Sequence, residues 1–339
     1  MEQIRFGILG AAAIAPNALI KPARLRDGVT VTAVAARDVD RASQFAAKHG
    51  IDRVLASYEE LIADPDIDAV YIPLPNGLHG EWTIRAVEAG KHVLCEKPFT
   101  ANADEARLVA AAADKSDVIV MEAFHWRYHP MATRLIEIVQ GEIGELEHID
   151  ATIAFPLFNR KDIRYDLALA GGAVMDAGCY AINIVRAVTG QEPEVVSATA
   201  KLMSPGVDRL TTAELRFPNG ATGRIVASMF SSRVLSISMR ARGTAGDVRA
   251  FNPVMPKLLG SMRVRRGGER HTERPPRSDT YGHQLDAFVA AVRDGQPFPS
   301  TVADAVLNME VIDSMYRAAG LQLRQPTNGP VDQSHGGTA

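Results

Sequence analysis

The sequence predicts an α/β protein of two domains, with a doubly wound parallel sheet followed by an α+β domain built on an open, mostly antiparallel sheet. Over the first third of the chain, short apolar runs alternate with alanine-rich helical stretches. Later, partly alternating strand-like runs follow one another, and helices are set apart from them. A chain of 339 residues is long enough to bury two cores of ordinary size.

The first domain is expected to span residues 1–123. Its expected strands are Ile4–Leu9, Val29–Ala36, Ala69–Ile72, His92–Cys95 and Val118–Met121. Its expected helices lie around Ala13–Leu25, Asp40–His49, Tyr58–Ala63, Leu78–Ala89 and Ala103–Ala113. A helix between successive strands makes a right-handed crossover, so these strands should run parallel in one sheet.

The second domain is expected to span residues 124–324. Its expected strands are Glu147–Ala154, Glu194–Lys201, Leu210–Phe217, Thr222–Ser228 and Leu235–Arg240, with a hairpin at Asn219-Gly220. Its expected helices are Met131–Val139, Val174–Val188 and Gln284–Val292, with another after Ser300. Partial alternation indicates that one sheet face is solvated or lies at a partner surface. Residues 325–339 lack apolar periodicity and are expected to be disordered.

The composition is that of a globular protein and gives no reason to expect nucleic acid or membrane as a partner. Hydrophobic residues make up 46% of the chain and charged residues 23%, with a net charge of −3. The basic run Arg263–Arg266 is short and fits a solvated hairpin. No apolar run approaches the roughly 18–20 residues of a membrane span, and no signal-peptide pattern opens the chain. Cys95 and Cys179 lie far apart and are expected to be reduced, which predicts a cytoplasmic protein.

A glycine-containing turn joins the first expected strand to the first expected helix. In Gly7-Ile8-Leu9-Gly10-Ala11-Ala12-Ala13-Ile14-Ala15, Gly10 suits the tight turn and Ala15 the close helix packing of a Rossmann dinucleotide fingerprint. Ala12 departs from the usual second glycine. Such a run by itself is equally typical of packing, but the βαβ context favours a cofactor. We therefore predict that Gly10, Ala12, Ala13 and Ile14 hold the pyrophosphate at the helix N-terminus.

The end of the second strand should discriminate between NAD and NADP. An NAD enzyme usually places an acidic side chain there, whereas this strand ends in Ala36 followed by Arg37 and Asp38. Arginine favours a 2′-phosphate by charge and bidentate geometry. Asp38 either reaches a ribose or caps the following helix, and we take capping as its role. The pattern favours NADP over NAD.

Lys97 is the most informative residue for chemistry. It stands in Cys95-Glu96-Lys97-Pro98-Phe99, directly after an apolar strand and before a helical stretch. Open α/β sheets hold their ligands at the carboxyl ends of their strands, so a lysine there is placed to meet a substrate.

Several motifs together resemble one family. They are the Gly7-Ile8-Leu9-Gly10 start, Pro75-Asn76-x-x-His79, Glu96-Lys97-Pro98 and Asp176-Ala177-Gly178-Cys179-Tyr180. The chain is similar, to about Leu323, to the glucose–fructose oxidoreductase / inositol dehydrogenase / rhizopine-catabolism (Gfo/Idh/MocA) family. The segment from Glu122 to Pro130 is particularly similar to the subgroup of dimeric dihydrodiol dehydrogenase and NADP-dependent D-xylose 1-dehydrogenase. Many family members carry histidine where this chain has Tyr180, but tyrosine is typical of that subgroup.

The resemblance implies a fold, a reaction and a set of site residues. It implies hydride transfer between a nicotinamide cofactor and a secondary alcohol or hemiacetal carbon of an aldose or cyclic trans-diol. It also implies a homodimer or higher homo-oligomer formed through the open sheet of the second domain. Lys97 would contact the reacting hydroxyl and the cofactor, often beside a cis Lys-Pro peptide, and Glu96 would hold the nicotinamide ribose. Pro75, Asn76, Trp126 and Arg127 complete the expected cofactor contacts.

Asp176, Tyr180, Lys97 and His79 form the candidate catalytic set. Asp176 and Tyr180 are spaced i, i+4 and share a face if the segment is helical. Reference pKa values of about 10 for tyrosine and 10.4 for lysine are high for a base at neutral pH. However, a lysine ammonium beside the phenol favours the phenolate, and the cationic oxidised nicotinamide disfavours a protonated lysine. Tyr180 as the acid/base with Lys97 orienting is our first choice, and the reverse assignment stays open. Tyr180 as a core residue and Asp176 as a helix cap are the structural alternatives.

Other polar residues near these motifs have two interpretations. His79 either donates to substrate or holds a loop, and Trp126 either stacks on a ligand or packs in the core. Arg127 is also a candidate for an ion pair between domains. His125 and His129 are spaced i, i+4, but no further ligands accompany them, so we expect no metal site.

The expected activity has two competitors. One is a sugar oxidoreductase whose tightly bound cofactor is reduced and reoxidised within a turnover. The other is a catalytically silent regulator that senses NADP. The identity of the sugar or diol is open. The loops around residues 155–165 and 251–257 should form the pocket, and the sequence does not provide their shape.

Overall fold

The computed structural model describes residues 3–232 and 235–327, which form two compact units. The first unit contains the chain up to Phe124 together with Tyr281–Val306. The second contains His125–Thr280 and the chain from Leu307 onward.

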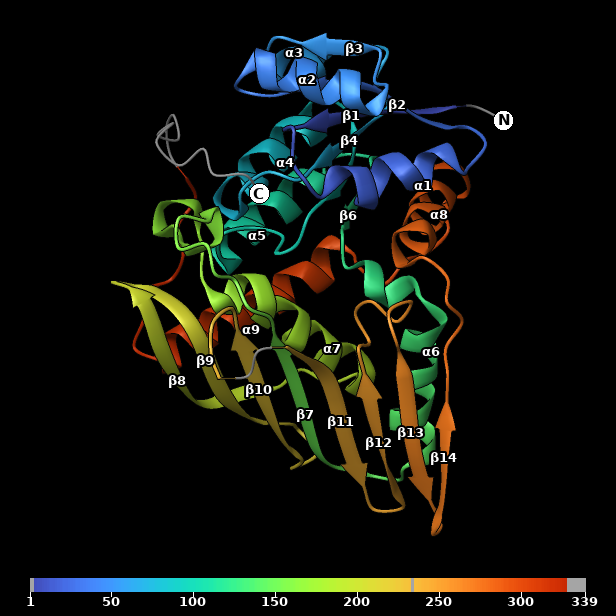
Figure 1. Cartoon of the computed structure of the whole chain (residues 1–339), viewed down its shortest axis with the longest axis vertical. Coiled ribbons are helices and arrows are strands. Elements are labelled where there is room, and N and C mark those ends of the chain that lie inside the picture. Colours follow the sequence, from blue (N-terminus) through green and yellow to red (C-terminus); the bar gives the residue numbers. More distant parts are fainter. Residues whose placement is uncertain (1–2, 233–234, 328–339) are drawn as a thin grey trace. The chain divides into compact units, whose positions relative to one another are not determined.

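The first unit is built on a six-stranded parallel sheet in the order β3-β2-β1-β4-β5-β6, which confirms the predicted doubly wound fold (Figure 1). The strands are β1 Ile4–Leu9, β2 Val29–Ala35, β3 Arg53–Leu55, β4 Ala69–Ile72, β5 His92–Cys95 and β6 Val120–Glu122. The helices are η1 Pro16–Ile20, α1 Lys21–Arg24, α2 Val39–His49, α3 Tyr58–Ala63, η2 Asn76–Leu78, α4 His79–Glu88 and α5 Ala103–Ala113. Among the strands of this unit, the sequence pattern missed β3, a short strand at the edge of the sheet.

Side-chain caps explain why several helices begin where the sequence predicts. The Asp38 carboxylate accepts a hydrogen bond from the Arg41 amide at 3.0 Å and starts α2, as predicted. Ser57 caps α3 and Asn102 caps α5 in the same way. Gly50, with a φ of 57°, ends α2 in the left-handed conformation that favours glycine.

Helix α8, Thr280–Asp294, packs almost entirely with the first unit, although the sequence pattern placed it in the second domain. The Phe288 ring lies 5.4 Å from the Phe6 ring of β1, and both side chains are fully buried. Asp286 forms a salt bridge with Arg26. These partners are more than 250 residues apart in sequence, so local periodicity carries no information about them. We keep the division into domains of residues 1–123 and 124–324 as a proposal.

The second unit is built on an eight-stranded sheet in the order β14-β13-β12-β11-β7-β10-β9-β8 (Figure 1). Its strands are β7 Leu146–Ala154, β8 Glu194–Ser204, β9 Val207–Arg216, β10 Thr222–Ser228, β11 Ser236–Gly243, β12 Gly246–Phe251, β13 Ser261–Arg266 and β14 Glu269–Glu273. Only β7 and β10 pair in parallel, which confirms a mostly antiparallel sheet. The Asn219-Gly220 hairpin joins β9 to β10, and Gly220 has a φ of 86°. The run Arg263–Arg266 forms one arm of a hairpin, as predicted.

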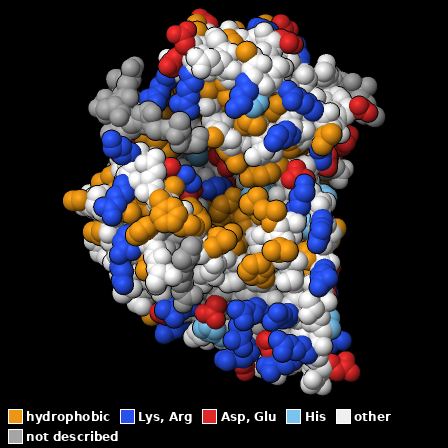
Figure 2. Space-filling view, viewed as in Figure 1, with side chains coloured by type: hydrophobic (Ala, Val, Ile, Leu, Met, Phe, Trp, Pro, Cys, Tyr) orange, Lys and Arg blue, Asp and Glu red, His pale blue; other side chains and the backbone are white. Residues whose placement is uncertain are grey.

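Helices cover one face of this sheet and leave the other open. The remaining helices are η3 His125–Tyr128, α6 Pro130–Glu137, η4 Ile138–Glu142, η5 Ile163–Tyr165, η6 Leu167–Leu169, η7 Val174–Gly178, α7 Cys179–Thr189 and α9 Val302–Ala318. Ile149 and Ala151 of β7 are buried on the covered side, where α7 packs. On the open side the cross-strand neighbours Arg240, Arg249 and Arg263 are exposed. Basic side chains therefore gather over β11–β13 (Figure 2).

One helical segment is long and apolar enough to pass a length-and-composition test for a membrane span. Among the described residues, this segment runs from Leu167 to Thr189, and its apolar 18-residue stretch has a mean hydropathy of 1.4, contrary to the expectation that no such run exists. Because 89% of the apolar stretch is buried inside the protein, it is a core helix of the second unit.

The predicted disordered tail falls mostly outside the described residues, which end at Thr327. Residues 325–327 form neither helix nor strand, and the Thr327 hydroxyl donates to the Ala168 carbonyl at 2.6 Å.

Candidate active site

The turn between β1 and η1 has the backbone that a dinucleotide fingerprint requires. Gly10 has a φ of 103°, and a Cβ added there would lie 3.0 Å from the Leu74 side chain. Ala13 and Ile14 are exposed on the turn, whereas Ala15 is buried where the helix packs on the sheet. The helix begins at this point, so its first amide groups lie at the carboxyl end of β1. The local residues thus fit a pyrophosphate group.

Two arginines follow β2 close to this turn. Arg37 is exposed two residues beyond the strand, and its charge lowers the pKa of the buried Tyr58 phenol, which burial raises by a larger amount. The Arg41 guanidinium donates to the Ala11 carbonyl of the turn at 3.1 Å. Asp38 is occupied in capping α2. The sequence analysis missed Arg41, which lies in the first turn of α2.

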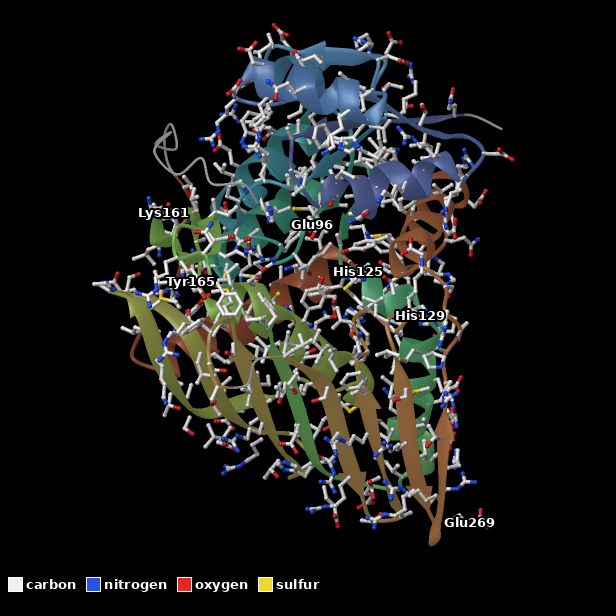
Figure 3. The ribbon with its side chains drawn as sticks, viewed as in Figure 1. Glu96, His125, His129, Lys161, Tyr165 and Glu269 are labelled. Carbon is white, nitrogen blue, oxygen red and sulfur yellow. The ribbon has the colours of Figure 1, made fainter. Side chains whose placement is uncertain are left out.

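Glu96, labelled in Figure 3, lies directly beyond the carboxyl end of β5, and Lys97 follows it, as predicted. The Tyr71 hydroxyl of β4 donates to the Glu96 carboxylate at 2.7 Å, and Glu96 is only 9% exposed. Lys97 is partly exposed and is followed by a cis peptide bond to Pro98. Pro75 and Asn76, also partly exposed, follow β4 on the same sheet edge. This edge of the first unit therefore gathers the predicted cofactor contacts of β4 and β5.

His79 is held inside the first unit. Its side chain is 1% exposed, Nδ1 lies 2.7 Å from the Pro98 carbonyl, and Nε2 lies 2.7 Å from the Leu74 carbonyl. Burial lowers the pKa of His79 to about 4; the two carbonyls favour the cation but offset this only in part, and the Lys97 ammonium adds to the lowering. Both ring nitrogens face backbone carbonyls, so the His79 ring is held between the Leu74 segment and the Lys97-Pro98 peptide. The structure thus supports the loop-holding interpretation of His79 over a substrate contact.

Glu105 is a buried carboxyl group in the same unit, and its pKa is shifted upward, whereas the pKa of His79 is shifted downward. The Glu105 carboxylate accepts a hydrogen bond from the Ala101 amide at 2.7 Å in the capping box of α5. Its carboxyl group packs against Gly80, where an added Cβ would collide with it. Burial raises the pKa of Glu105 to about 7.

Glu105→Gln is expected to stabilise the protein increasingly as the pH rises. The folded protein holds a proton on Glu105 that the unfolded chain releases near pH 4.5, so the wild type loses free energy of unfolding between about pH 4.5 and pH 7. Glutamine keeps the acceptor for Ala101 and removes this loss, a gain of about 2–3 kcal/mol above pH 7.

Urea unfolding of both proteins at about pH 5 and pH 8 measures the difference. His79 contributes equally to both proteins, with stability lost as the pH falls from about 6.5 to 4, so it cancels in the comparison. A stability difference that does not change with pH would show that Glu105 is ionised in the fold throughout.

In the second unit, Asp176 and Tyr180 lie one turn apart on the continuous helical segment formed by η7 and α7, as their spacing predicted. Asp176 is mostly buried, and the Arg164 guanidinium lies 3.7 Å from its carboxylate. Arg164 also donates to Asp162 at 2.8 Å, and these carboxylates raise its pKa above its ordinary value. The residue at the N-terminus of η7 is Ala173, so capping does not account for Asp176. Arg164 was missed by the sequence analysis.

Tyr180 is bonded to a buried histidine. Its hydroxyl lies 3.1 Å from Nε2 of His125, and Nδ1 of His125 lies 2.9 Å from the Thr280 hydroxyl. The His125 and Tyr180 rings meet edge to face at 5.9 Å, and His125 is 2% exposed. These residues come from three separate parts of the chain, so the sequence contained no spacing that could have revealed them together.

Two other residues of the Glu122–Pro130 motif, Trp126 and His129, have hydrogen-bond partners within the second unit. Trp126 is fully buried and donates from its indole nitrogen to Asn183 at 2.9 Å, which supports the core-packing interpretation. His129 accepts from the Met131 amide at 3.1 Å and caps α6. Arg127 lies on η3 and is partly exposed. Among the residues that the structure describes, no three histidine, cysteine or acidic side chains gather in a metal-binding group. Both cysteines are free and buried.

A buried carboxylate ties together the elements around η7. Asp208 of β9 accepts from Arg324 at 2.9 Å, from the Tyr316 hydroxyl at 3.1 Å and from the Thr211 hydroxyl at 2.8 Å. It also accepts from the Val174 amide at 2.9 Å, at the start of the segment that carries Asp176. The Asp208 and Arg324 side chains are both fully buried. This network links β9, α9 and the C-terminal segment to the helix that carries the candidate catalytic residues.

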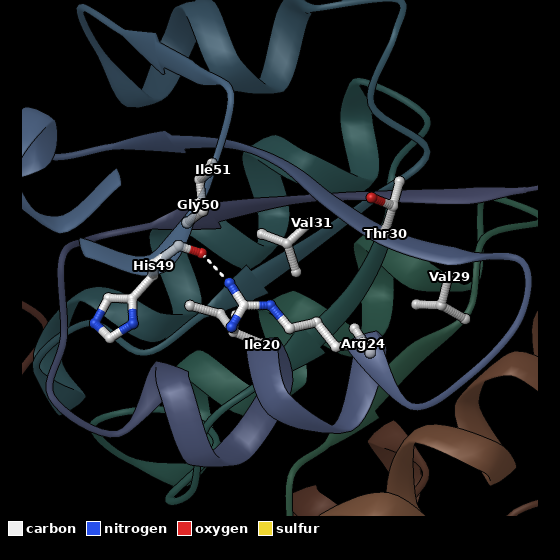
Figure 4. A pocket seen from close by; sticks show the side chains of 9 residues that line it. Ile20, Arg24, Val29, Thr30, Val31, His49, Gly50 and Ile51 are labelled. Carbon is white, nitrogen blue, oxygen red and sulfur yellow. Dashed lines mark hydrogen bonds between the residues drawn. The ribbon is translucent and has the colours of Figure 1, made fainter. Parts of the chain in front are cut away.

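A cavity of about 180 Å³ lies elsewhere in the first unit. It is lined by Ile20, Ala23, Arg24, Val29, Thr30, Val31, His49, Gly50 and Ile51, and Arg24 crosses it to donate to the His49 carbonyl (Figure 4). Its floor includes the first residues of β2, at the amino ends of the parallel strands. Ligands of such sheets bind at the carboxyl ends, so this cavity is separate from the candidate site.

Comparison with known proteins covers both units. Residues 4–124 match the model of an oxidoreductase family with an NAD-binding Rossmann fold, GFO_IDH_MocA, and residues 132–249 match a GFO/IDH/MocA C-terminal domain. D-xylose 1-dehydrogenase (NADP(+)) 2 of Haloferax volcanii is 38% identical over 93% of this chain and 97% of its own length. Trans-1,2-dihydrobenzene-1,2-diol dehydrogenase of Bos taurus is 36% identical over 74% of this chain and 75% of its own.

Solved structures agree with the sequence comparisons. The 3-ketoreductase KijD10 of Actinomadura kijaniata, in complex with NADP and TDP-benzene, is 29% identical with a TM-score of 0.87, over 94% of this chain and 98% of its own. The aldose-aldose oxidoreductase of Caulobacter crescentus, complexed with glycerol, is 28% identical with a TM-score of 0.85 over the same shares. The resemblance noted in the sequence is confirmed, and the chain belongs to the GFO/IDH/MocA family of oxidoreductases.

Proposed function

We propose that this oxidoreductase is an NADP-dependent dehydrogenase that transfers hydride between NADP and a secondary alcohol or hemiacetal carbon of an aldose or cyclic trans-diol. The observation that carries the proposal is Lys97 at the carboxyl end of β5, beside the buried Glu96. Similarity to an NADP-dependent D-xylose 1-dehydrogenase and to a dihydrodiol dehydrogenase supports the substrate class.

The first unit would hold the cofactor. Gly10, Ala12, Ala13 and Ile14 would face the pyrophosphate, Arg37 and Arg41 the 2′-phosphate, and Glu96, Asn76 and Pro75 the nicotinamide ribose. Arginine side chains suit a phosphate because they carry a permanent charge and a planar set of donors. The bound cofactor supplies the acceptor and donor of hydride. NADP rather than NAD is supported by the arginine beyond β2 and by the capping role of Asp38.

Lys97 and Tyr180 would act on the same substrate hydroxyl. In the oxidation direction, the hydroxyl proton moves to Tyr180 while hydride leaves the carbon that bears the oxygen. The Lys97 ammonium polarises that oxygen and favours the ionised form of the tyrosine. Asp176, held by Arg164, would orient the substrate from the same helix face as Tyr180. Acid–base assistance of this kind contributes roughly 10²–10⁴-fold to rate.

A substrate panel tests the proposal. Purified protein is mixed with NADP or NAD and with pentoses, hexoses and cyclic trans-diols, and the absorbance of the reduced nicotinamide is followed. We expect steady reduction of NADP with at least one aldose or diol and slower reduction of NAD. Binding of NADP without reduction by any substrate would indicate a silent sensor and overturn the proposal.

A tightly bound, internally recycled cofactor is the second candidate. It is favoured by the similarity to an aldose-aldose oxidoreductase over nearly the whole chain. In that case the purified protein would carry NADP through gel filtration, and one sugar would be oxidised while another is reduced without net change in the reduced nicotinamide. Product analysis by chromatography separates this outcome from an ordinary dehydrogenase.

Arg37→Ala is expected to weaken the selection of NADP. Loss of a charge-assisted contact to the 2′-phosphate should raise the KM for NADP by about 10- to 100-fold. The KM for NAD, which lacks that phosphate, should change by about twofold or less. Arg107→Ala, which removes an exposed arginine on α5 that forms a surface ion pair with Asp104, is the matched control. An equal rise in both KM values would mean that Arg37 does not contact the 2′-phosphate.

We also propose a cytoplasmic homodimer or higher homo-oligomer that forms through the open face of the β7–β14 sheet. That face exposes apolar as well as basic side chains, since Phe251 lies two residues after Arg249 on β12 and both side chains are exposed. Two free, buried cysteines are consistent with a reducing compartment. Sedimentation analysis of the purified protein tests the oligomeric state.

A further inference from the structure

Tyr180 is part of a hydrogen-bonded chain of three side chains within the second unit. Its hydroxyl lies 3.1 Å from Nε2 of His125, and Nδ1 of His125 lies 2.9 Å from the hydroxyl of Thr280. His125 and Thr280 are 2% and 4% exposed, so water does not compete for these bonds. Tyr180, at one end of this hydrogen-bonded series, is partly exposed.

We propose that His125 is a positioning residue that acts through Tyr180: its Nε2–H donates to the Tyr180 oxygen in the base form of the tyrosine, and Thr280 selects that tautomer. The inference rests on the proposed role of Tyr180 as the acid/base.

The chemistry of the three groups determines the direction of the bonds. A phenolate oxygen can only accept, so the imidazole nitrogen facing it must carry the proton. In a neutral ring, the other nitrogen is then an acceptor, and the Thr280 hydroxyl can donate to it. A neutral histidine thus provides a donor to the ionised tyrosine without a second buried charge. A methionine or leucine at position 125 would leave the phenolate without this donor.

The arrangement stabilises the phenolate form of Tyr180, which is the form that accepts the substrate proton in oxidation. The Tyr180 oxygen takes the hydroxyl proton of the substrate and becomes a neutral phenol, while the carbon gives up its hydride to NADP. The imidazole keeps its own proton throughout, so its role is to hold and orient the phenolate. In the reduction direction, the same donor stabilises the phenolate that is left after Tyr180 gives its proton to the carbonyl oxygen.

A double-mutant cycle tests the coupling between the two residues. We expect His125→Leu to lower kcat by about 10- to 100-fold with little change in the KM for NADP. His125→Gln, whose amide can still donate to the Tyr180 oxygen, should restore most of this loss. In the Tyr180→Phe background, His125→Leu should cause no further loss of kcat. A further loss in that background, as large as in the wild type, would show a general structural role and overturn the inference.

His129→Gln is the matched control. It replaces a neighbouring buried histidine that caps α6 by accepting from the Met131 amide. We expect kcat within about twofold of the wild type. If His129→Gln lowers kcat as much as His125→Leu, the loss at position 125 reports the packing of the segment, and the inference fails.

A measurement without turnover separates this inference from the proposed function. In protein labelled with ¹³C at the tyrosine ring carbon that bears the oxygen, the resonance absent from Tyr180→Phe belongs to Tyr180. In His125→Leu its titration midpoint should rise by about one to two pH units, with Asp176, one turn away, present in both proteins. An unchanged midpoint would overturn the inference, whether or not a substrate has been found. A shifted midpoint in a protein that oxidises no sugar or diol would support the bond and leave only the proposed function contradicted.

Discussion

Lys97→Met is expected to lower kcat by about 10²–10⁴-fold with the proposed sugar or diol substrate. Methionine keeps the length and the apolar stem of lysine but removes the ammonium group. In the proposed mechanism, that charge polarises the substrate oxygen and favours the ionised form of Tyr180, and both effects would be lost. Steady-state kinetics of both proteins, combined with NADPH binding by fluorescence, measure the effect. Cofactor affinity should fall much less than kcat, because the pyrophosphate turn is unchanged.

Lys115→Met provides the control for this prediction, since Lys115 is an exposed lysine of the same unit. Its kcat should stay within about twofold of the wild type. Circular dichroism and the thermal midpoint should be unchanged in both variants, which excludes unfolding as the cause of lost activity. Full activity of Lys97→Met would remove the chemical basis of the proposed mechanism.

Asp208→Asn is expected to cost about 3–5 kcal/mol of the free energy of unfolding. The substitution leaves the fully buried Arg324 cation without its counter-charge and weakens the bonds from Thr211, Tyr316 and the Val174 amide. The Arg324 guanidinium also lies 4.1 Å from the centre of the Tyr316 ring, so the two side chains should loosen together. Urea unfolding followed by tryptophan fluorescence and circular dichroism measures the loss.

Two further variants provide the controls for the stability loss expected of Asp208→Asn. Glu147→Gln breaks an exposed ion pair with Arg242 in the same unit and should cost about 1 kcal/mol or less. Combining Asp208→Asn with Arg324→Met should recover part of the stability, because the unpaired buried charge is then absent. A cost for Asp208→Asn that does not exceed that of Glu147→Gln would mean that the buried network contributes little.

Local rules were enough for most of the secondary structure. Strand β1 has the predicted bounds, Ile4–Leu9, because a short apolar run that ends at a glycine turn is a local signal for a buried strand. Helix α5 likewise matches its prediction, since Asn102 provides a cap and alanines follow it. The three-residue strand β3 and the strands β12 and β14 escaped the analysis, because short or largely polar segments become strands only when neighbours pair with them.

Local rules also placed part of the candidate site. Lys97 follows β5 and Arg37 follows β2, and in a parallel sheet both positions are determined by chain order alone. The sequence could not decide between a substrate contact and a loop-holding role for His79, or between ligand stacking and core packing for Trp126. Burial favours the structural role in each case: both ring nitrogens of His79 meet backbone carbonyls, and Trp126 bonds Asn183 in the core.

The sequence by itself determined the parallel sheet, the ligand edge of that sheet, and the arginine and lysine that stand on it, because these follow from periodicity and strand order. Only the tertiary structure brought His125 and Thr280 to Tyr180, packed α8 against β1, and gathered four hydrogen-bond donors around Asp208. Such contacts join residues far apart in the chain. Their energy comes from burial and hydrogen-bond geometry that exist only after folding, so no local pattern contains them.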